Sequence, residues 1–166
     1  MTNLKRHIGL FLASFALLAN SAEANAPKPI IKAVENNVTI SNFDKRQIDC
    51  IATNIYKEAG NQSLQGKIAV GNVVMNRVQH PKFPKTPCGV IHQKSGRTCQ
   101  FSWVCQNKSI KDFKLYSQVR DIAVDVYYDK VPDVTKGALY FHARSVKPNW
   151  GKRLTVRIDD HLFYRG

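Results

Sequence analysis

The residue best suited to acid–base chemistry in this chain is Glu58. It is the one carboxylate between Asp49 and Asp112, and it ends a run of apolar residues at helical spacing, directly before Ala59 and Gly60. The negative end of a helix dipole and burial beside apolar neighbours both disfavour an ionised carboxylate, so we expect a raised pKa for Glu58. A carboxylic acid that stays protonated near neutral pH is what general-acid cleavage of a glycosidic bond requires. On composition alone, a solvated glutamate at a helix end is the alternative.

A second group of candidate residues lies in the segment 99–105, which reads Cys-Gln-Phe-Ser-Trp-Val-Cys. If its two cysteines pair, a tight loop presents the rings of Phe101 and Trp103 beside the amide of Gln100 and the hydroxyl of Ser102. Aromatic rings stack on the apolar faces of sugars while amides and hydroxyls bind sugar hydroxyls, so this combination suits carbohydrate. The alternative is that both rings fill the core.

A third group of candidates is spread over the last 30 residues: Tyr140, His142, Asn149, Trp150 and His161. We expect seven residues to line one substrate cleft: Gln100, Ser102, Trp103, Tyr140, His142, Trp150 and His161. The two histidines could bind zinc, but the chain lacks a paired HExxH motif or a third ligand at a recognisable spacing, so hydrogen-bonding or structural roles are favoured and no metal is expected.

Other common motifs are missing from the sequence. There is no Gly-rich phosphate loop, no Ser-centred nucleophile elbow and no dinucleotide fingerprint. This argues against NTP- and NAD-dependent chemistry, and we expect no cofactor.

Three helices are predicted to position these residues. Apolar residues recur at helical spacing over 44–59, 64–78 and 112–129, and His80-Pro81 ends the second helix. The four-residue link makes the first two helices antiparallel neighbours. Gly66 and Gly71 inside the second helix each cost roughly 1 kcal/mol against Ala, which indicates close approach to another backbone or a ligand, with tight helix packing as the alternative.

The remaining segments predict an α+β fold. Residues 81–108 carry several prolines, glycines and three cysteines, which indicates a long, irregular loop held by covalent links. Residues 138–142, 153–158 and 161–164 have strand character. We therefore expect a mainly helical lobe with a small antiparallel sheet.

The four cysteines are predicted to form two disulfides. An even number of cysteines in an exported chain favours disulfides over a metal site, and three pairings are possible. In the expected helix arrangement the end of the second helix lies near the start of the first, which brings Cys88 within range of Cys50. We predict Cys50–Cys88 and Cys99–Cys105.

The first 24 residues resemble an export signal. Lys5 and Arg6 precede a twelve-residue apolar run, 8–19, and Ala22-Glu23-Ala24 offers a small-x-small cleavage site, so the mature chain is predicted to start at Asn25. Twelve apolar residues fall short of the ~20 that span a membrane, so we expect no transmembrane anchor. We expect a periplasmic or extracellular protein with an extended leader over 25–40 and one domain over 41–166.

The chain is strongly basic. It has 25 Lys and Arg against 12 Asp and Glu, a formal charge of +13, of which +12 remains after residues 1–24 are removed. A hydrophobic content of 43% and an aromatic content of 10% exclude disorder as the state of the whole chain. The charge predicts attraction to the anionic envelope surface, and we expect a monomer.

Several motifs, taken together, resemble the SleB/CwlJ-type spore-cortex-lytic cell-wall hydrolases from about Cys50 to the C-terminus. The motifs are Glu58-Ala-Gly, Asn76-Arg77-Val, Phe83-Pro, Cys88-Gly-Val-Ile, Cys99-Gln-Phe-Ser-Trp103-Val-Cys105, Gly137-Ala-Leu-Tyr140-Phe-His142 and His161-x-Phe-Tyr164. The resemblance implies a lysozyme-like domain that acts on peptidoglycan glycan strands, with Glu58 in the place of the catalytic glutamate. Lys57 and Asn61-Gln62 depart from the more acidic, Arg-containing stretch of many relatives, and no repeat-type wall-binding domain is present.

The resemblance further implies lytic transglycosylase activity between N-acetylmuramic acid and N-acetylglucosamine. One carboxyl group protonates the glycosidic oxygen and then helps the muramyl C6 hydroxyl attack C1, which leaves a 1,6-anhydro end. A two-carboxylate hydrolase stays open, with Asp112, Asp121 or Asp159 as the second group. Two other classes also stay open: an N-acetylmuramoyl-L-alanine amidase, and a non-catalytic basic module that binds envelope glycans or nucleic acid. For the leading hypothesis we expect no nucleic-acid partner.

Overall fold

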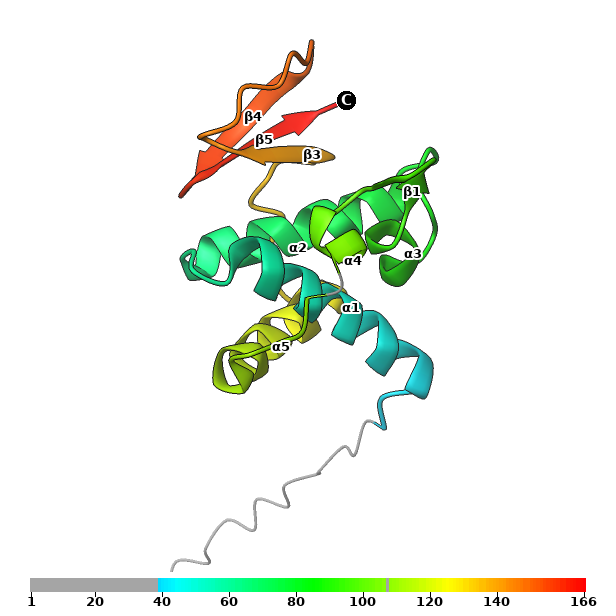
Figure 1. Cartoon of the computed structure of the whole chain (residues 1–166). Coiled ribbons are helices and arrows are strands. Elements are labelled where there is room, and N and C mark those ends of the chain that lie inside the picture. The colour runs from blue at the N-terminus through cyan, green and yellow to red at the C-terminus, as the bar shows by residue number, and fades with distance from the viewer. Residues whose placement is uncertain (1–38, 107) are drawn as a thin grey trace, which may run out of the picture. The chain divides into compact units, whose positions relative to one another are not determined.

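Three long helices form the larger part of the fold (Figure 1). They are α1 (Asn42–Ala59), α2 (Leu64–Gln79) and α5 (Phe113–Tyr127), within two residues of the predicted bounds. The computed structural model describes residues 39–106 and 108–166, so the predicted signal sequence and nearly all of the leader lie outside the described residues. In this described part, no helix is long and apolar enough to cross a membrane.

Each long helix begins at a capping side chain. The hydroxyls of Ser41 and Ser63 and the carboxylate of Asp112 each accept a hydrogen bond from the backbone N–H three residues later, at 2.9–3.2 Å. Such caps satisfy a backbone donor that the first turn of a helix leaves without a partner. The helix starts are therefore fixed by local chemistry.

The main core lies where the three helices meet. Buried side chains from α1 (Ile48, Ile51, Ile55), α2 (Val70, Val74) and α5 (Val119, Ala123) form one apolar cluster. At Gly71 in α2, an added Cβ would lie 3.1–3.3 Å from side-chain atoms of Val126 in α5 and Ile55 in α1. Tight helix packing therefore accounts for this glycine.

The segment between α2 and α5 is more ordered than predicted. It contains α3 (Pro87–Ile91), β1 (Lys94–Ser95), β2 (Thr98–Cys99) and α4 (Ser102–Gln106), so the expectation of an irregular loop is wrong in this respect. Elements of two to five residues are too short to show a periodic pattern in the sequence. The predicted pairing is confirmed: disulfides join Cys50 to Cys88 and Cys99 to Cys105.

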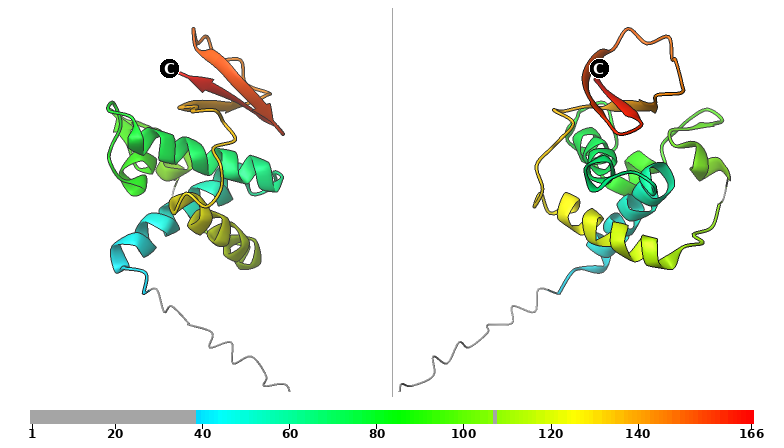
Figure 2. Two further views of the ribbon diagram at one scale, coloured as in Figure 1. Left: turned by 180° about the vertical axis from the view of Figure 1, so that it is seen from behind. Right: turned by 90° about the vertical axis from the view of Figure 1, so that its left-hand side faces the viewer.

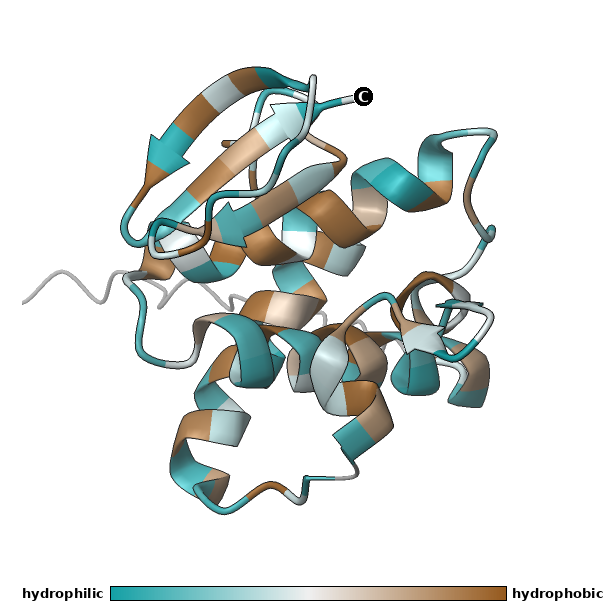
Figure 3. Ribbon diagram, turned by 45° about the horizontal axis from the view of Figure 1, so that its top comes forward, coloured by the Kyte–Doolittle hydropathy of each residue, from teal (hydrophilic) through white to brown (hydrophobic). Residues whose placement is uncertain are grey.

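The small sheet lies on the other side of α2 from α5 (Figures 1 and 2). Its strands are β3 (Tyr140–Ala143), β4 (Arg153–Ile158) and β5 (His161–Arg165), in the antiparallel order β3-β5-β4. Hydrophobic and hydrophilic residues alternate along β3 and β4 (Figure 3). The inward residues Ile158 and Phe163, together with Ala138, pack on Ala69 and Val73 of α2 and form a second buried cluster.

The last turn of α2 holds the segment that leads into β3. The amide of Asn76 donates to the carbonyl oxygen of Ala138 at 3.1 Å, and Nε of Arg77 donates to the carbonyl oxygen of Leu139 at 2.7 Å. These two bonds join the helical lobe to the sheet directly before Tyr140. They set the position of β3 relative to the helices.

Candidate active site

A pocket of about 280 Å³ opens between the end of α1, the start of α4 and β3. Its lining combines one carboxyl group with two histidines, an arginine and short polar and apolar side chains: Glu58, Arg77, Gln100, Phe101, Ser102, Phe141, His142, Ala143, Val146 and His161. The structure thus brings Glu58 together with four of the seven residues predicted to bind substrate. These four are Gln100, Ser102, His142 and His161.

Glu58 stands in the last turn of α1, one residue before the helix ends. Its side chain is half-buried, and burial raises the pKa of its carboxyl group, as the sequence predicts. In the described part of the chain the carboxyl group makes no hydrogen bond or ion pair. It is therefore available to a ligand in the pocket and poised as a proton donor.

The two histidines of the pocket have different surroundings. In His142, Nδ1 lies 2.9 Å from the carbonyl oxygen of Ala143, and Nε2 lies 2.9 Å from the hydroxyl of Tyr164. A carbonyl oxygen only accepts, so we assign the proton to Nδ1, and Nε2 accepts from the tyrosine O–H. Both ring nitrogens are occupied, which fixes the ring and leaves it no proton to transfer.

His161 in β5 is buried, and its Nδ1 has no hydrogen-bond partner in the described structure. Burial lowers the pKa of His161, and the opposing effect of Asp160 and Asp159 is smaller. Because desolvation disfavours the charged imidazolium, the ring is neutral. A neutral ring with a free nitrogen can donate to or accept from a polar ligand.

Arg77 is the largest buried side chain among the described residues. Its guanidinium carbon lies 5.3–5.8 Å from the ring centres of Phe83, Phe101 and Tyr140, which gives it cation–π contacts in place of a carboxylate partner. Burial lowers the pKa of Arg77 to about 10, so it remains charged at neutral pH. Its Nη1 atom makes no hydrogen bond in the described structure.

Three of the predicted substrate-binding residues do not line this pocket. Trp103 packs against the main core, and its indole N–H donates to Oδ1 of Asn54 at 3.2 Å. Tyr140 and Trp150 instead form an aromatic cluster on the sheet with His142 and Tyr164, with ring centres 5.2–6.1 Å apart. His142 belongs both to this cluster and to the pocket, so the two adjoin.

Among the described residues that line the pocket, Glu58 carries the one carboxyl group. Asp112 caps α5, and Asp159 accepts hydrogen bonds from the backbone N–H and the hydroxyl of Ser63 at 2.9 and 2.6 Å. These two candidates for a second catalytic carboxylate are thus engaged in helix starts. Within residues 39–106 and 108–166, no three His, Cys, Asp or Glu side chains gather in a way that could hold a metal ion.

Sequence reasoning from residue types missed Arg77 as part of the site. The signal was present: position 77 is four residues after the buried Val73 and seven after Val70, so it falls on the core-facing stripe of α2. A charged residue on that stripe is rare and needs a local reason. Phe141, Ala143 and Val146 were also missed, because which strand borders the pocket depends on sheet order.

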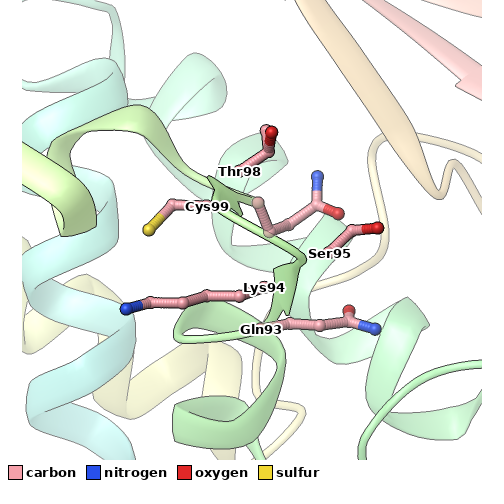
Figure 4. A pocket seen from close by; sticks show the side chains of 6 residues that line it. Gln93, Lys94, Ser95, Thr98 and Cys99 are labelled. Carbon is pink, nitrogen blue, oxygen red and sulfur yellow. The ribbon is translucent and has the colours of Figure 1, made fainter.

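A second hollow, of about 250 Å³, lies beside the β1–β2 hairpin. Figure 4 shows Gln93 and Ser95 on one side of the hairpin, with Lys94 and the sulfur of Cys99 on the other. Gln100 lines both this hollow and the Glu58 pocket. The disulfide-closed segment therefore forms the wall between them.

The fold and the site define a class of α+β domain with one carboxylic acid in a pocket between a helical lobe and a small sheet. The same fold occurs in the catalytic domain of the Bacillus cereus SleB protein, with a TM-score of 0.60 and 23% identity over 73% of this chain and 91% of that one. It occurs equally in the catalytic domain of the germination-specific lytic transglycosylase SleB from Bacillus anthracis, with a TM-score of 0.60 and 23% identity over 77% and 98%. The expected fold class is confirmed.

The family model described as Cell Wall Hydrolase matches residues 61–164, and this chain belongs to that family. The spore cortex-lytic enzyme of Bacillus subtilis is 27% identical over 126 residues, which are 73% of this chain and 38% of that protein. The spore cortex-lytic enzyme of Oceanobacillus iheyensis is 23% identical over 149 residues, 87% of this chain and 48% of that protein. This chain thus spans less than half the length of these relatives.

Proposed function

We propose that this chain is an exported enzyme that cleaves peptidoglycan at the glycosidic bond between N-acetylmuramic acid and N-acetylglucosamine, with residues 41–166 as its catalytic domain. The observation that carries the proposal is the half-buried carboxyl group of Glu58, with a raised pKa, in a pocket that no other described carboxylate lines. Membership of the Cell Wall Hydrolase family supports the substrate class. A relative of known structure, from Bacillus anthracis, is described as a lytic transglycosylase, which supports the reaction type.

In the proposed reaction, protonated Glu58 donates its proton to the glycosidic oxygen as the bond to the muramyl C1 breaks. The resulting carboxylate then accepts the proton of the muramyl C6 hydroxyl as that oxygen bonds to C1. The products are a 1,6-anhydro-muramyl end and a free N-acetylglucosamine end, and Glu58 is again protonated. One carboxyl group suffices, in keeping with the pocket lining.

The polar groups around Glu58 suit a sugar. The amide of Gln100, the hydroxyl of Ser102 and the free Nδ1 of His161 can bind sugar hydroxyl and acetamido groups. We assign His142 a positioning role, because both of its ring nitrogens are already bonded. Trp150, exposed on the adjoining sheet face, can stack on a neighbouring sugar, whereas one face of the Tyr140 ring is covered by Lys152, whose Nζ lies 3.7 Å from the ring centre.

The test is digestion of purified peptidoglycan by the full chain and by its Glu58→Gln variant. We expect the unchanged chain to release soluble fragments with 1,6-anhydro ends, identified by mass spectrometry. The variant, which keeps the shape but has no proton to donate, should lower the rate by at least about a hundredfold. Circular dichroism of the variant checks that it is folded.

Other products would overturn the proposal in distinct ways. Reducing ends in place of anhydro ends indicate a hydrolase that uses water. Free stem peptides released in a chelator-sensitive reaction indicate a zinc-dependent amidase. Binding without any bond cleavage indicates a non-catalytic module. Undiminished release by the Glu58→Gln variant rules out Glu58 as the acid.

A further inference from the structure

Away from the Glu58 pocket, three basic residues face one hollow of about 220 Å³ at the opposite end of the sheet. Its lining consists of Lys136, Arg153, Leu154, Thr155 and Arg165. No described carboxylate lines it, and none of the three cations forms an ion pair in the part of the chain that the structure describes. The hollow therefore concentrates positive charge without internal compensation.

The strand register places two of these charges in direct opposition. Arg153 in β4 and Arg165 in β5 are antiparallel partners. Like charges directly opposite each other destabilise a sheet. A β-bulge between Leu154 and Val156 separates this pair from the register of the buried residues Ile158 and Phe163, so Arg153 and Arg165 are brought opposite each other beyond the bulge despite this cost.

The guanidinium group of Arg165 is held in place on one side. Its Nε donates to the carbonyl oxygen of Lys136 at 2.7 Å. Gly137, at a φ of 76°, leaves the room that this group occupies, since a Cβ there would lie 3.2 Å from Nη2. A guanidinium fixed through Nε presents its remaining N–H groups in a planar fork, which suits an oxyanion.

A neighbouring hollow on the same sheet provides a contrast. It is lined by Arg144, Arg157, Asp159 and Leu162, so its two arginines share the hollow with a carboxylate. The excess of positive charge is thus specific to the end of the sheet where Arg153 and Arg165 meet. A general surplus of basic residues on the surface would not make these two hollows differ in charge.

The basic hollow and the Glu58 pocket lie at opposite ends of the same strands. In β5, Arg165 lines the hollow and His161 lines the pocket, four residues and about 13 Å apart. The aromatic cluster of Tyr140, His142, Trp150 and Tyr164 lies on the opposite face of the strands from Arg165, because successive side chains of a strand alternate between its faces. A peptide stem of about four residues, at up to ~3.5 Å per residue, can cover the distance from a glycan bound at Glu58 to the hollow.

We propose that this hollow binds a carboxylate of a peptide stem on the same peptidoglycan polymer whose glycan occupies the Glu58 pocket. This inference rests on the proposed function, which supplies the polymer. Lys136, Arg153 and Arg165 would bind the carboxylate by charge-assisted hydrogen bonds. The hollow then acts as a second binding site that holds the strand while Glu58 cleaves it.

The test measures binding without cleavage. The full chain carrying Glu58→Gln is mixed with insoluble peptidoglycan, and the free protein is measured after sedimentation. Adding Arg153→Gln should weaken binding about tenfold, the usual effect of losing one charge-assisted hydrogen bond. The matched control is Arg157→Gln, which removes the same charge from the same strand at the hollow that contains Asp159 and should change binding less than twofold, on the order of a screened surface charge.

A second arm identifies the ligand. When the stem carboxylates are converted to amides, binding should fall at least to the level of Arg153→Gln, and the difference between the two arginine variants should vanish. Equal weakening of binding by Arg153→Gln and Arg157→Gln would show that the hollow is not a specific binding site. A difference between the two variants that persists on amidated polymer would show that the ligand is not a stem carboxylate. Arg153-dependent binding to phosphatidylglycerol vesicles, with none to peptidoglycan, would assign a lipid phosphate instead. Because binding is measured without turnover, these results are independent of whether the unchanged chain forms anhydro ends.

Discussion

Burial in the last turn of α1 makes Glu58 a weaker acid than a solvated glutamate. The sequence predicts this from two causes, the helix dipole and apolar neighbours, and desolvation is the cause that the structure identifies. The position of Glu58 in the chain was enough to single it out. What the sequence could not supply is the pocket, because the residues that enclose the carboxyl group come from β3, β5 and the start of α4.

The raised pKa makes a testable contribution to stability. The folded chain holds the proton of Glu58 more tightly than the unfolded chain, so the free energy of unfolding decreases as the pH rises from the ordinary glutamate pKa through the raised one. Glu58→Gln should remove this decrease and leave the variant more stable than the unchanged chain at neutral pH. Denaturant titrations across this pH window measure the effect.

The protonation state of Glu58 also governs the proposed reaction, and the rate should change with pH in the same direction as the stability. Cleavage needs the protonated carboxyl group, so the rate should fall as the pH rises through the raised pKa of Glu58. As a control, Asp121→Asn removes an exposed carboxylate and should leave both pH profiles unchanged. If Glu58→Gln keeps the pH-dependent loss of stability, the burial assigned to Glu58 is wrong.

The different surroundings of the two pocket histidines could not be predicted from residue types. His142 and His161 are equivalent candidates in the sequence, yet one ring is fixed by Ala143 and Tyr164 and the other has a free, buried Nδ1. The difference arises from neighbours across β3 and β5, and cross-strand partners cannot be read from one chain's pattern without the register. Arg77 was overlooked for a related reason, since its partners are rings from three separate segments.

At the scale of elements, the long helices could be predicted and the short elements could not. Helices α1, α2 and α5 have repeated apolar spacing and capping residues at their starts. By contrast, β1, β2, α3 and α4 are two to five residues long and depend on two disulfides and the core for their conformation. The pairing of the cysteines could be predicted because it follows from the helix arrangement.

The two disulfides should differ in their effects. They close loops with sequence separations of 38 and 6 residues, for which loop-closure entropy predicts losses of about 4 and about 2 kcal/mol in the free energy of unfolding. Replacing both Cys50 and Cys88 by Ser should therefore reduce stability more. Replacing both Cys99 and Cys105 by Ser should reduce activity more, because that bridge holds Gln100 and Ser102 at the Glu58 pocket.

Thermal unfolding and peptidoglycan release, measured on both double variants at a temperature where both are folded, separate the two effects. The two variants serve as controls for each other, since each removes one disulfide and adds two hydroxyls. A larger loss of activity in the Cys50/Cys88 variant under these conditions would show that the segment 99–105 keeps its shape without its own bridge.

At the scale of the whole molecule, the sheet order could not be predicted from the sequence. Strand character was evident in all three segments, but β5 lies between β3 and β4 only because its inner residue Phe163 completes the buried cluster on α2. This order makes β3 an edge strand and places it along the Glu58 pocket. Half of the candidate site therefore depends on a tertiary feature.

The formal charge of +13 predicts a strong dependence of activity on ionic strength. Raising NaCl from about 0.05 to 0.5 M shortens the Debye length from roughly 14 to roughly 4 Å, which screens attraction between the basic chain and an anionic polymer. Release from intact peptidoglycan should fall several-fold over this range, on the order expected for screened long-range attraction. The control substrate is peptidoglycan whose carboxylates have been converted to amides, for which the rate should change little. Equal salt sensitivity on both substrates would argue against a role for the charge in substrate attraction.

The contacts of Asn76 and Arg77 with the carbonyl groups of Ala138 and Leu139 have a consequence for how such an enzyme could diverge. Glu58 belongs to the helical lobe and β3 to the sheet. The width of the opening between them is therefore set by two adjacent side chains of α2, Asn76 and Arg77. Shortening or lengthening either one would resize the opening while the carboxyl group and both disulfides stayed in place. Selection for thicker or thinner polymers could therefore act on one helical turn.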